Sequence, residues 1–294
     1  MKLLDQNLKV HGALLTVGLI YGANYSIAKA PMPDLISPFA FIFIRVAATT
    51  LIFWIIDGFN KREPVKYPRD FITLIKCAVL GVVANQLLFF NGLSMTSTIS
   101  ASVIMTLNPI IVLIGSYLIL REPVTKLKIA GVLLGSAGAV LLILRNQISW
   151  TEGSFLGDLL VFMNAISYGI YLILVKPLMR RYNALTIIKW IFLIGLILII
   201  PFGYKDLVAV DWVNMPASGW SSIIYVIIFT TVLAYLLNMW ALKFVSPTVV
   251  SYYVYLQPLF ATLIAILFLH EFPETNILLY ASMIFAGVFL VSKK

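Results

Sequence analysis

Residues 105–122 read MTLNPIIVLIGSYLILRE, and residues 254–271 read VYLQPLFATLIAILFLHE. Each stretch places an amide directly before a proline, as Asn108-Pro109 in the first and Gln257-Pro258 in the second. Each then continues as a largely apolar run whose last leucine, Leu120 or Leu269, lies two residues before a glutamate. The two stretches are 149 residues apart (254 − 105), and self-similarity at a fixed offset indicates an internal repeat.

The similarity extends well beyond these two stretches. An offset of 149 aligns residues 97–143 with residues 246–292 without a gap. Near the start of the chain an offset of 147 places Tyr21 on Tyr168 and Lys29 on Lys176. We therefore divide the chain into two repeats, residues 1–146 and residues 147–294.

The composition places both repeats in a membrane. Of 294 residues, 61% are hydrophobic and 11% are charged, and the mean hydropathy is +1.00. Soluble domains are about half apolar and a quarter charged, so a soluble fold is excluded. Intrinsic disorder is excluded for the same reason, and a disulfide framework is excluded because Cys77 is the only cysteine.

The apolar segments predict an all-α integral membrane protein with ten transmembrane helices. A membrane-spanning helix needs about 20 apolar residues. The predicted spans are residues 11–30, 37–57, 70–93, 97–120, 126–144, 154–177, 184–204, 218–242, 247–269 and 275–292. Each repeat thus holds five spans. Because five is odd, the second repeat enters the membrane from the opposite side, an arrangement typical of secondary transporters with a midplane binding site.

The basic residues predict the orientation. The two chain ends and the loops after even-numbered spans hold fifteen Lys and Arg residues, against three in the loops after odd-numbered spans. Cytoplasmic loops are enriched in these residues, so both termini are expected in the cytoplasm. The net charge of +9 is therefore interpreted as a mark of the cytoplasmic loops and chain ends and not as a sign of nucleic-acid binding.

The sequence resembles the drug/metabolite transporter superfamily, in particular its ten-span EamA-like branch. The resemblance covers nearly the whole chain. The stretches that show it most clearly are YGANYSIAKA at 21–30, FIFIRVAATTLIF at 41–53, GDLLVFMNAISYGIYLILVKPL at 157–178, and the two proline-containing stretches quoted above. The family usually has Trp where this chain has Tyr21, and often Gly where it has His270. The resemblance implies an exporter of a bacterial-type cytoplasmic membrane and does not define the substrate.

Uncharged polar and aromatic side chains recur in the middle of the predicted spans. Such groups usually face the protein interior or a cavity, and together they suit a small organic ligand with some polarity. The candidate substrate-binding residues are Tyr21, Asn24, Asn85, Asn108, Asn164, Tyr168, Tyr171, Tyr235, Asn238, Tyr252, Tyr255 and Gln257. The alternative is that these groups only bond or pack between helices.

The predicted span 247–269 carries tyrosines on two faces. Tyr252 and Tyr255 are three residues apart and share one face, whereas Tyr253 and Gln257 share another. One of these pairs is expected to face the cavity, and periodicity leaves open which one.

Two prolines and two lysines are candidates for gating. Pro109 and Pro258 lie within spans, where proline removes a backbone hydrogen bond and kinks the helix. Lys29 and Lys176 are equivalent in the repeat and lie near opposite membrane faces. Each lysine either extends its amine to the interface or closes one mouth of the pathway.

The remaining charges are interpreted as structural. Arg45 lies near the middle of the second span and is expected to bond helix-end carbonyls; the alternative is that it grips a substrate carboxylate. Glu122 and Glu271 are expected to pair with basic residues or to cap helices. Lys189 is expected to reach the interface from the end of its span.

Small residues favour close helix packing in the fifth span. Gly131, Gly135 and Gly138 are spaced four and three apart, which lets a neighbouring helix approach closely. Packing inside the bundle is preferred over a dimer seam, so the chain is expected to be a monomer or a homodimer.

Several functions lack the residues that they need. All twelve acidic residues lie at span ends or in loops, which disfavours a deep proton relay. Cys77 and the two histidines form no ligand cluster, so no metal is expected. There is no nucleotide-binding P-loop, and no serine has a base at its depth. We therefore expect no cofactor and no enzyme.

The predicted function is a secondary transporter that moves a small polar organic metabolite, an amino acid or a related compound, by alternating access. The alternative is efflux of an amphipathic or aromatic drug-like compound. A membrane assembly or receptor protein is the non-transport alternative. The expected partners are the small-molecule substrate and the lipid bilayer.

Overall fold

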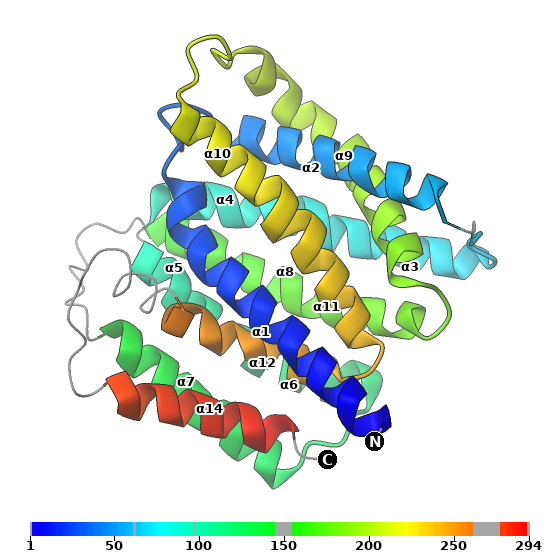
Figure 1. The fold of residues 1–294 in the computed structure, drawn as a ribbon, viewed down its shortest axis with the longest axis vertical. Coiled ribbons are helices and arrows are strands. Elements are labelled where there is room, and N and C mark those ends of the chain that lie inside the picture. The colour runs from blue at the N-terminus through cyan, green and yellow to red at the C-terminus, as the bar shows by residue number, and fades with distance from the viewer. Residues whose placement is uncertain (1, 61–62, 97, 145–154, 261–276, 293–294) are drawn as a thin grey trace.

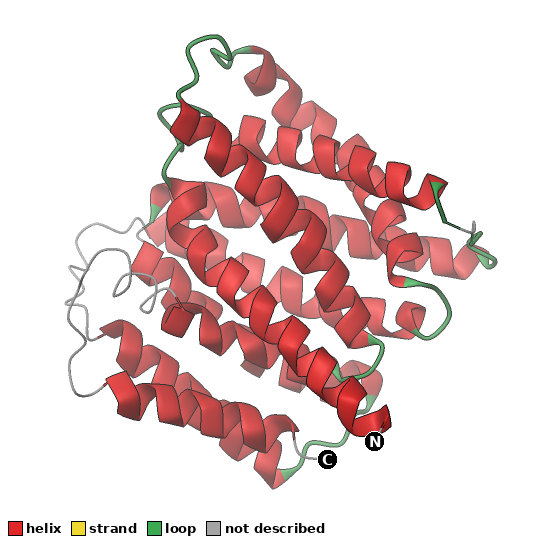
Figure 2. Ribbon diagram, in the orientation of Figure 1, coloured by secondary structure: helices red, strands yellow, loops and turns green. Residues whose placement is uncertain are grey.

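The chain folds into a bundle of helices (Figure 1). The structure, a computed structural model, describes residues 2–60, 63–96, 98–144, 155–260 and 277–292. Within these ranges there is no β-strand, as Figure 2 shows. The α-helices are α1 (Lys2–Lys29), α2 (Pro38–Gly58), α3 (Pro68–Ala78), α4 (Asn85–Met95), α5 (Thr98–Met105), α6 (Asn108–Leu120), α7 (Lys126–Leu144), α8 (Phe155–Met179), α9 (Ala184–Val208), α10 (Ala217–Tyr225), α11 (Ala234–Leu242), α12 (Pro247–Tyr252) and α14 (Ile277–Ser292).

Six helical segments in the described part of the chain are long and apolar enough to cross a membrane. They are Pro38–Gly58, Pro68–Met95, Ser100–Leu120, Phe155–Met179, Ala184–Val208 and Ala217–Leu242. These six correspond to six of the predicted spans, which confirms a helical protein with several membrane-spanning candidates. The full number of ten remains a prediction, because the predicted spans 11–30, 126–144, 247–269 and 275–292 are not among these six.

Two long helical segments are widened in their middle. A π-helical segment, η1 (Val79–Ala84), joins α3 to α4, and a second one, η2 (Val226–Leu233), joins α10 to α11. Their first residues are 147 positions apart (226 − 79), the same offset that aligns the first spans. These segments were not among the features predicted from the sequence. Single-turn π-bulges within α-helices often mark functional sites.

Two other segments are interrupted close to the prolines. α5 ends at Met105 and α6 begins at Asn108, directly before Pro109. A 3-10 turn, η3 (Tyr253–Tyr255), follows α12 and precedes Pro258. A role for these interruptions in gating stays a prediction.

The bundle has two ends, which we name after the lysines that lie there. The Lys176 end holds the start of α1, the end of α8 and the loop residues 59–60, 63–67 and 243–246 (Figure 1). The Lys29 end holds the end of α1 and the loops at 30–37 and 209–216.

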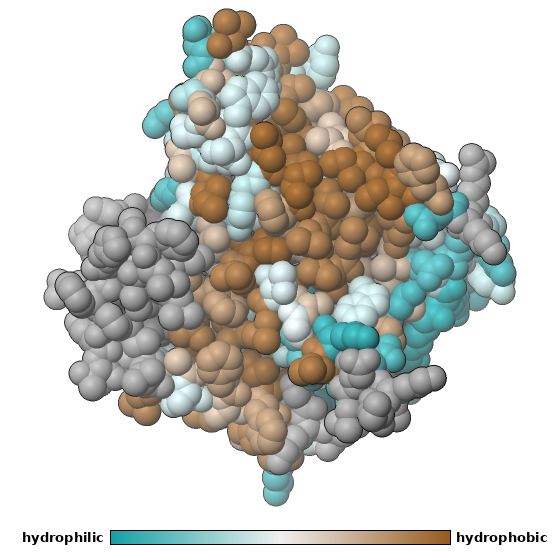
Figure 3. Space-filling view, viewed as in Figure 1, coloured by the Kyte–Doolittle hydropathy of each residue, from teal (hydrophilic) through white to brown (hydrophobic). Residues whose placement is uncertain are grey.

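Helix α8 runs through the middle of the bundle and packs against α3, α4, α5 and α6. Two helix pairs, α2 with α9 and α7 with α14, have the most extensive contacts. Side chains on the outside of the bundle include many large apolar ones, such as Leu51, Leu118 and Phe202. In Figure 3 hydrophobic side chains cover the middle of the visible face, and hydrophilic ones gather at the Lys176 end, as expected of a protein whose middle contacts lipid.

Candidate functional site

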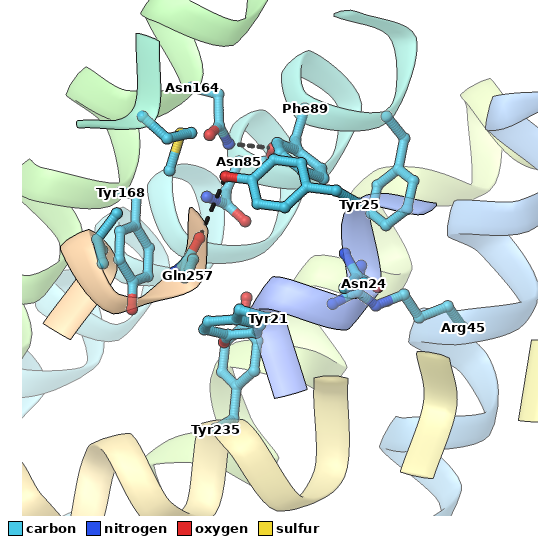
Figure 4. A pocket seen from close by; sticks show the side chains of 13 residues that line it. Tyr21, Asn24, Tyr25, Arg45, Asn85, Phe89, Asn164, Tyr168, Tyr235 and Gln257 are labelled. Atoms are coloured by element: carbon cyan, nitrogen blue, oxygen red, sulfur yellow. Dashed lines mark hydrogen bonds between the residues drawn. The ribbon is translucent and has the colours of Figure 1, made fainter. Parts of the chain in front are cut away.

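A cavity lies in the middle of the bundle, between helices from both parts of the chain (Figure 4). The space open to the centre of a water-sized sphere is about 70 Å³. Since one water needs at least about 10–15 Å³ by this measure, there is room for roughly five. The lining residues are Tyr21, Asn24, Tyr25, Arg45, Asn85, Phe89, Phe90, Met105, Asn164, Tyr168, Tyr235, Val254 and Gln257.

Helix α1 supplies one wall through a short polar stripe. Tyr21, Asn24 and Tyr25 are spaced three and four residues apart, so an α-helix directs them to one side. The Tyr25 hydroxyl donates a hydrogen bond to Gln257 Oε1 at 3.1 Å. Asn24 is 6% exposed, and its Oδ1 has no hydrogen-bond partner in the described structure. This oxygen is therefore a free acceptor at the cavity.

The opposite wall joins α4 and α8. Asn164 Nδ2 donates to the backbone oxygen of Asn85 at 2.6 Å, and this contact draws α8 against the start of α4 just after η1. Asn164 Oδ1 is buried and has no partner in the part of the chain that the structure describes. Phe89 packs edge to face on Tyr25, with ring centroids 5.9 Å apart. The cavity thus combines amide groups with aromatic rings.

The two π-helical segments hold side chains at the edge of this cavity. The Tyr235 hydroxyl donates to Gly81 O in η1 at 2.8 Å. Arg45 Nε donates to Thr231 Oγ1 in η2 at 2.5 Å. Both segments therefore anchor a cavity side chain from another helix.

Seven of the candidate substrate-binding residues line the cavity together: Tyr21, Asn24, Asn85, Asn164, Tyr168, Tyr235 and Gln257. Asn238 lies beside it: it lines a smaller adjoining space of about 10 Å³ with Tyr168 and Tyr253, and its Nδ2 is 3.5 Å from the Tyr168 hydroxyl. Ligand binding by any of these residues stays a prediction.

The other four candidates make internal contacts and do not line the main cavity. Asn108 Nδ2 donates to Ala165 O at 2.8 Å, and the Tyr171 hydroxyl donates to Met239 Sδ at 3.4 Å. The Tyr252 hydroxyl bonds Gly131 O, and the Tyr255 hydroxyl lies 2.6 Å from Ser136 Oγ. The face of this segment that meets the cavity carries Gln257, whereas the Tyr252 and Tyr255 face packs on α7.

The cavity also contains residues that were not among the predicted site residues. Tyr25 follows Tyr21 by four residues and Phe89 follows Asn85 by four, so helical spacing alone could have added both to the candidates. Phe90, Met105 and Val254 are ordinary apolar residues, which carry no signal in so apolar a chain.

The structural charges occupy varied environments. Arg45 lines the cavity and lies 4.9 Å from the centroid of the Phe90 ring. Glu122 follows the end of α6, and partial burial raises the pKa of its carboxyl group, an effect that the nearby cations of Lys128, Lys176 and Arg180 oppose. Glu271 lies outside the described residues. Lys189 differs from the expectation that it reaches the interface, because it is buried and pairs with Asp57 at 2.5 Å.

The two repeat-equivalent lysines make equivalent contacts at opposite ends of the bundle. Lys29 Nζ donates to Thr96 O at 2.6 Å, and Lys176 Nζ donates to Val245 O at 2.6 Å. The two carbonyls are 149 residues apart (245 − 96). Lys176 also bonds Leu242 O. Each lysine thus joins the end of its own helix to the end of another, and a gating role stays a prediction.

A helical bundle with apolar membrane-spanning candidates and a polar, aromatic cavity in its middle is typical of small-molecule transporters. Comparison with known proteins identifies the family. The profile of the EamA-like transporter family matches residues 8–144 and, a second time, residues 155–293. The chain therefore belongs to the EamA-like transporter family, whose members are transporters and not enzymes.

Several similar proteins are named as transporters or exporters. An "Uncharacterized transporter" of Archaeoglobus fulgidus is 27% identical over 98% of this chain and 99% of its own length. The "Uncharacterized transporter YyaM" of Bacillus subtilis is 26% identical over 88% of this chain and 86% of its own length. A "Probable terminal-alkyne amino-acid exporter" of Streptantibioticus cattleyicolor is 22% identical over 77% of this chain and 74% of its own length.

A solved crystal structure has the same fold. It superposes with a TM-score of 0.71, covers 97% of this chain and 96% of its own chain, and shares 16% sequence identity. At this identity the likeness concerns the fold alone.

Proposed function

We propose that this protein exchanges or facilitates passage of a small polar organic metabolite, an amino acid or a related compound, across the cytoplasmic membrane of a bacterial-type cell. The observation that carries the proposal is the central cavity, which is lined by uncharged amides and aromatic rings from both parts of the chain. A highly charged phosphorylated substrate would require several inward cations, and the described lining holds one, Arg45.

The architecture that we propose is ten transmembrane helices in two inverted repeats, residues 1–146 and 147–294, with both termini in the cytoplasm. Three findings support it: the two matches of the family profile, the π-helical segments 147 residues apart, and the equivalent contacts of Lys29 and Lys176. Repeats of opposite orientation can exchange conformations, which gives alternating access to a site between them.

Export is the proposed direction. It rests on the family and on the relative from Streptantibioticus cattleyicolor whose printed name is that of an amino-acid exporter. No proton coupling is proposed, because the cavity lining in the described structure contains no carboxylate and no histidine.

The test is flux into proteoliposomes that contain the purified protein. A panel of labelled amino acids is offered with and without a pH gradient, and transport above empty vesicles for at least one compound is expected. Absence of flux for every amino acid removes this proposal and leaves efflux of drug-like compounds as the next one to test. Strict dependence on the pH gradient contradicts the uncoupled mechanism.

A pair of matched variants assigns the flux to the cavity. Asn24→Ala removes a cavity amide and is expected to lower transport at least about tenfold, because one hydrogen bond to a charged ligand group contributes about 1.5–3 kcal/mol. Asn60→Ala is the control, because Asn60 is exposed, its side chain donates only to Ile56 O near the end of α2, and it does not line the cavity. Equal transport by both variants would assign Asn24 to packing.

A further inference from the structure

Arg45 is a buried cation at the cavity with no acidic partner. It is 6% exposed, and it lies on α2 seven residues after Pro38, which places it about 10 Å along the helix from the first turn. Among the described residues, no carboxylate oxygen lies within 4.0 Å of its guanidinium group. Its positive charge is therefore not neutralised by this part of the protein.

The guanidinium group of Arg45 is bonded to the protein through Nε, and its two terminal nitrogens have no hydrogen bond to a described residue. Its Nε donates to Thr231 Oγ1 at 2.5 Å, and its carbon atom lies 4.9 Å from the centroid of the Phe90 ring. In Figure 4 the group extends from α2 to the side chain of Asn24 at the cavity. Four N–H donors in a fixed plane are thus available at the cavity.

The other buried cations of the bundle show that this is unusual. Lys189 is paired with the carboxylate of Asp57 at 2.5 Å. Lys176 donates to two backbone oxygens where α11 ends. Burying a charge is costly unless it is paired or fully hydrogen-bonded. Arg45 alone among these three keeps most of its donors unused, which is expected if a ligand supplies the acceptor.

We propose that Arg45 binds a carboxylate group of the transported molecule, an inference that rests on the proposed transport function. A planar guanidinium presents two parallel N–H groups that match the two oxygens of a carboxylate. A single cation suits one negative charge. The free Oδ1 of Asn24 next to it accepts a hydrogen bond, which suits an ammonium or hydroxyl group close to that carboxylate.

The rest of the cavity fits the remainder of such a molecule. Phe89, Met105 and Val254 add apolar surface to the same cavity, which suits the carbon skeleton of a small acid. A positively charged drug-like compound would meet an unpaired cation instead. The proposal therefore favours small carboxylic acids, with or without an amine, over organic cations.

The test compares acids with their amides. Purified protein in detergent is titrated with each of the twenty common L-amino acids and with acetate, propionate, lactate and pyruvate, and in parallel with the corresponding primary amides. Binding is measured from the shift of the melting temperature, and flux is measured separately in proteoliposomes. We expect at least one acid to bind and its amide to bind about 10- to 100-fold more weakly, the loss that corresponds to a charge-assisted hydrogen-bonded contact.

Variants assign the effect to Arg45. Arg45→Gln keeps a similar length without the charge and is expected to remove the preference for the acid, whereas Arg45→Lys keeps the charge without the planar fork and is expected to retain part of it. Lys205→Gln is the matched control, because it removes the same charge from an exposed position near the end of α9. If Arg45→Gln does not fold, the comparison of acids with amides on the unmodified protein still decides.

The outcomes separate this inference from the proposed function. Equal binding of acid and amide, or no binding by any acid of the panel, overturns the carboxylate site. Equal flux of an acid and its amide overturns the carboxylate site and is still consistent with the proposed transport function. Acid binding that depends on Arg45, without flux of any compound, supports the site and overturns the transport function.

Discussion

Two helix pairs with extensive contacts hold the bundle together by different means. In the α2–α9 pair large aromatic rings meet, as with Phe53 and Phe192 at 5.4 Å between centroids. Polar bonds close this pair at both ends: Lys189 binds Asp57 at 2.5 Å, and Ser37 binds Asp206 at 2.6 Å. The α2–α9 pair therefore depends largely on specific side chains, although its backbones also approach closely at Gly203, where an added Cβ would lie 2.8 Å from Phe39 O.

The α7–α14 pair depends instead on the absence of side chains. A Cβ atom added to Gly131 would lie 2.8 Å from Gly287 O, and one added to Gly138 would lie 2.9 Å from Met283 Cβ. The two backbones approach closely because these positions carry no side chain. Lipid tails are as apolar as leucine, so helices gain little from apolar contact alone and need close packing or polar bonds. The α2–α9 pair illustrates polar bonds, and the α7–α14 pair illustrates close packing.

The largest loss of stability is expected when one member of the Asp57–Lys189 ion pair between α2 and α9 is removed. Asp57→Leu leaves the Lys189 ammonium buried without its partner and is expected to lower the free energy of unfolding by about 3–5 kcal/mol. Equilibrium unfolding in mixed detergent and SDS micelles measures it. Asp34→Leu, at an exposed position, is the control.

The double variant Asp57→Leu with Lys189→Met sharpens this prediction. Replacing both members of a buried pair by apolar groups is often close to neutral, so most of the lost stability is expected to return. A double variant as unstable as Asp57→Leu would show that the pair does more than neutralise a charge.

A smaller loss is expected from a single methyl group between α7 and α14. In Gly287→Ala the new Cβ would overlap the Tyr252 hydroxyl oxygen and lie 2.7 Å from Gly131 O, so a neighbour must move. Overpacking of this kind typically costs about 1–3 kcal/mol. Gly12→Ala is the control, because nothing lies within 4 Å of a Cβ there. Equal melting temperatures for the two variants would argue against close approach of α7 and α14.

The hydroxyl at the other end of the α2–α9 pair is expected to matter less than the ion pair. Ser37 precedes α2, accepts a hydrogen bond from Ala40 N at 3.1 Å and binds Asp206. Loss of such a helix cap in Ser37→Ala is expected to cost about 1 kcal/mol. The melting temperature should fall slightly, whereas Ser221→Ala, exposed and bonded only within its own helix, should leave it unchanged.

The smallest effect is expected at Tyr255, which packs on α7 beside the α14 contact. Tyr255→Phe removes the bond to Ser136, and polar bonds between membrane helices contribute about 0.6 kcal/mol on average. Stability should change little, and transport should equal that of the unmodified protein. Impaired transport with normal folding would return Tyr255 to the substrate site, where the sequence alone had placed it.

Sequence was sufficient for the helical membrane fold, because apolar length and the spacing of polar residues are local properties. It also selected seven residues that meet at one cavity, since Tyr21 with Asn24 and Asn164 with Tyr168 follow helical spacing. The constant offsets between equivalent prolines and between equivalent lysines indicated the internal repeat.

Three-dimensional packing decided what sequence could not. The face of Tyr252 and Tyr255 was ambiguous, because neighbouring faces of one helix look alike until a partner such as α7 covers one of them. Arg45 was interpreted as structural, since no property of the chain alone reveals that its guanidinium reaches a cavity. Phe90 and Met105 could not be chosen among many apolar residues.

The π-helical segments affect how an insertion or deletion in this chain would change the cavity lining. An α-helix turns by about 100° per residue, so one residue gained or lost within η1 (Val79–Ala84) would rotate everything that follows by that angle. Asn85 lies directly after η1 and Phe89 follows four residues later, and both point into the cavity. A single-codon insertion at this position can thus redirect a whole lining face at once. Substrate preference in such a protein can change by length as well as by substitution.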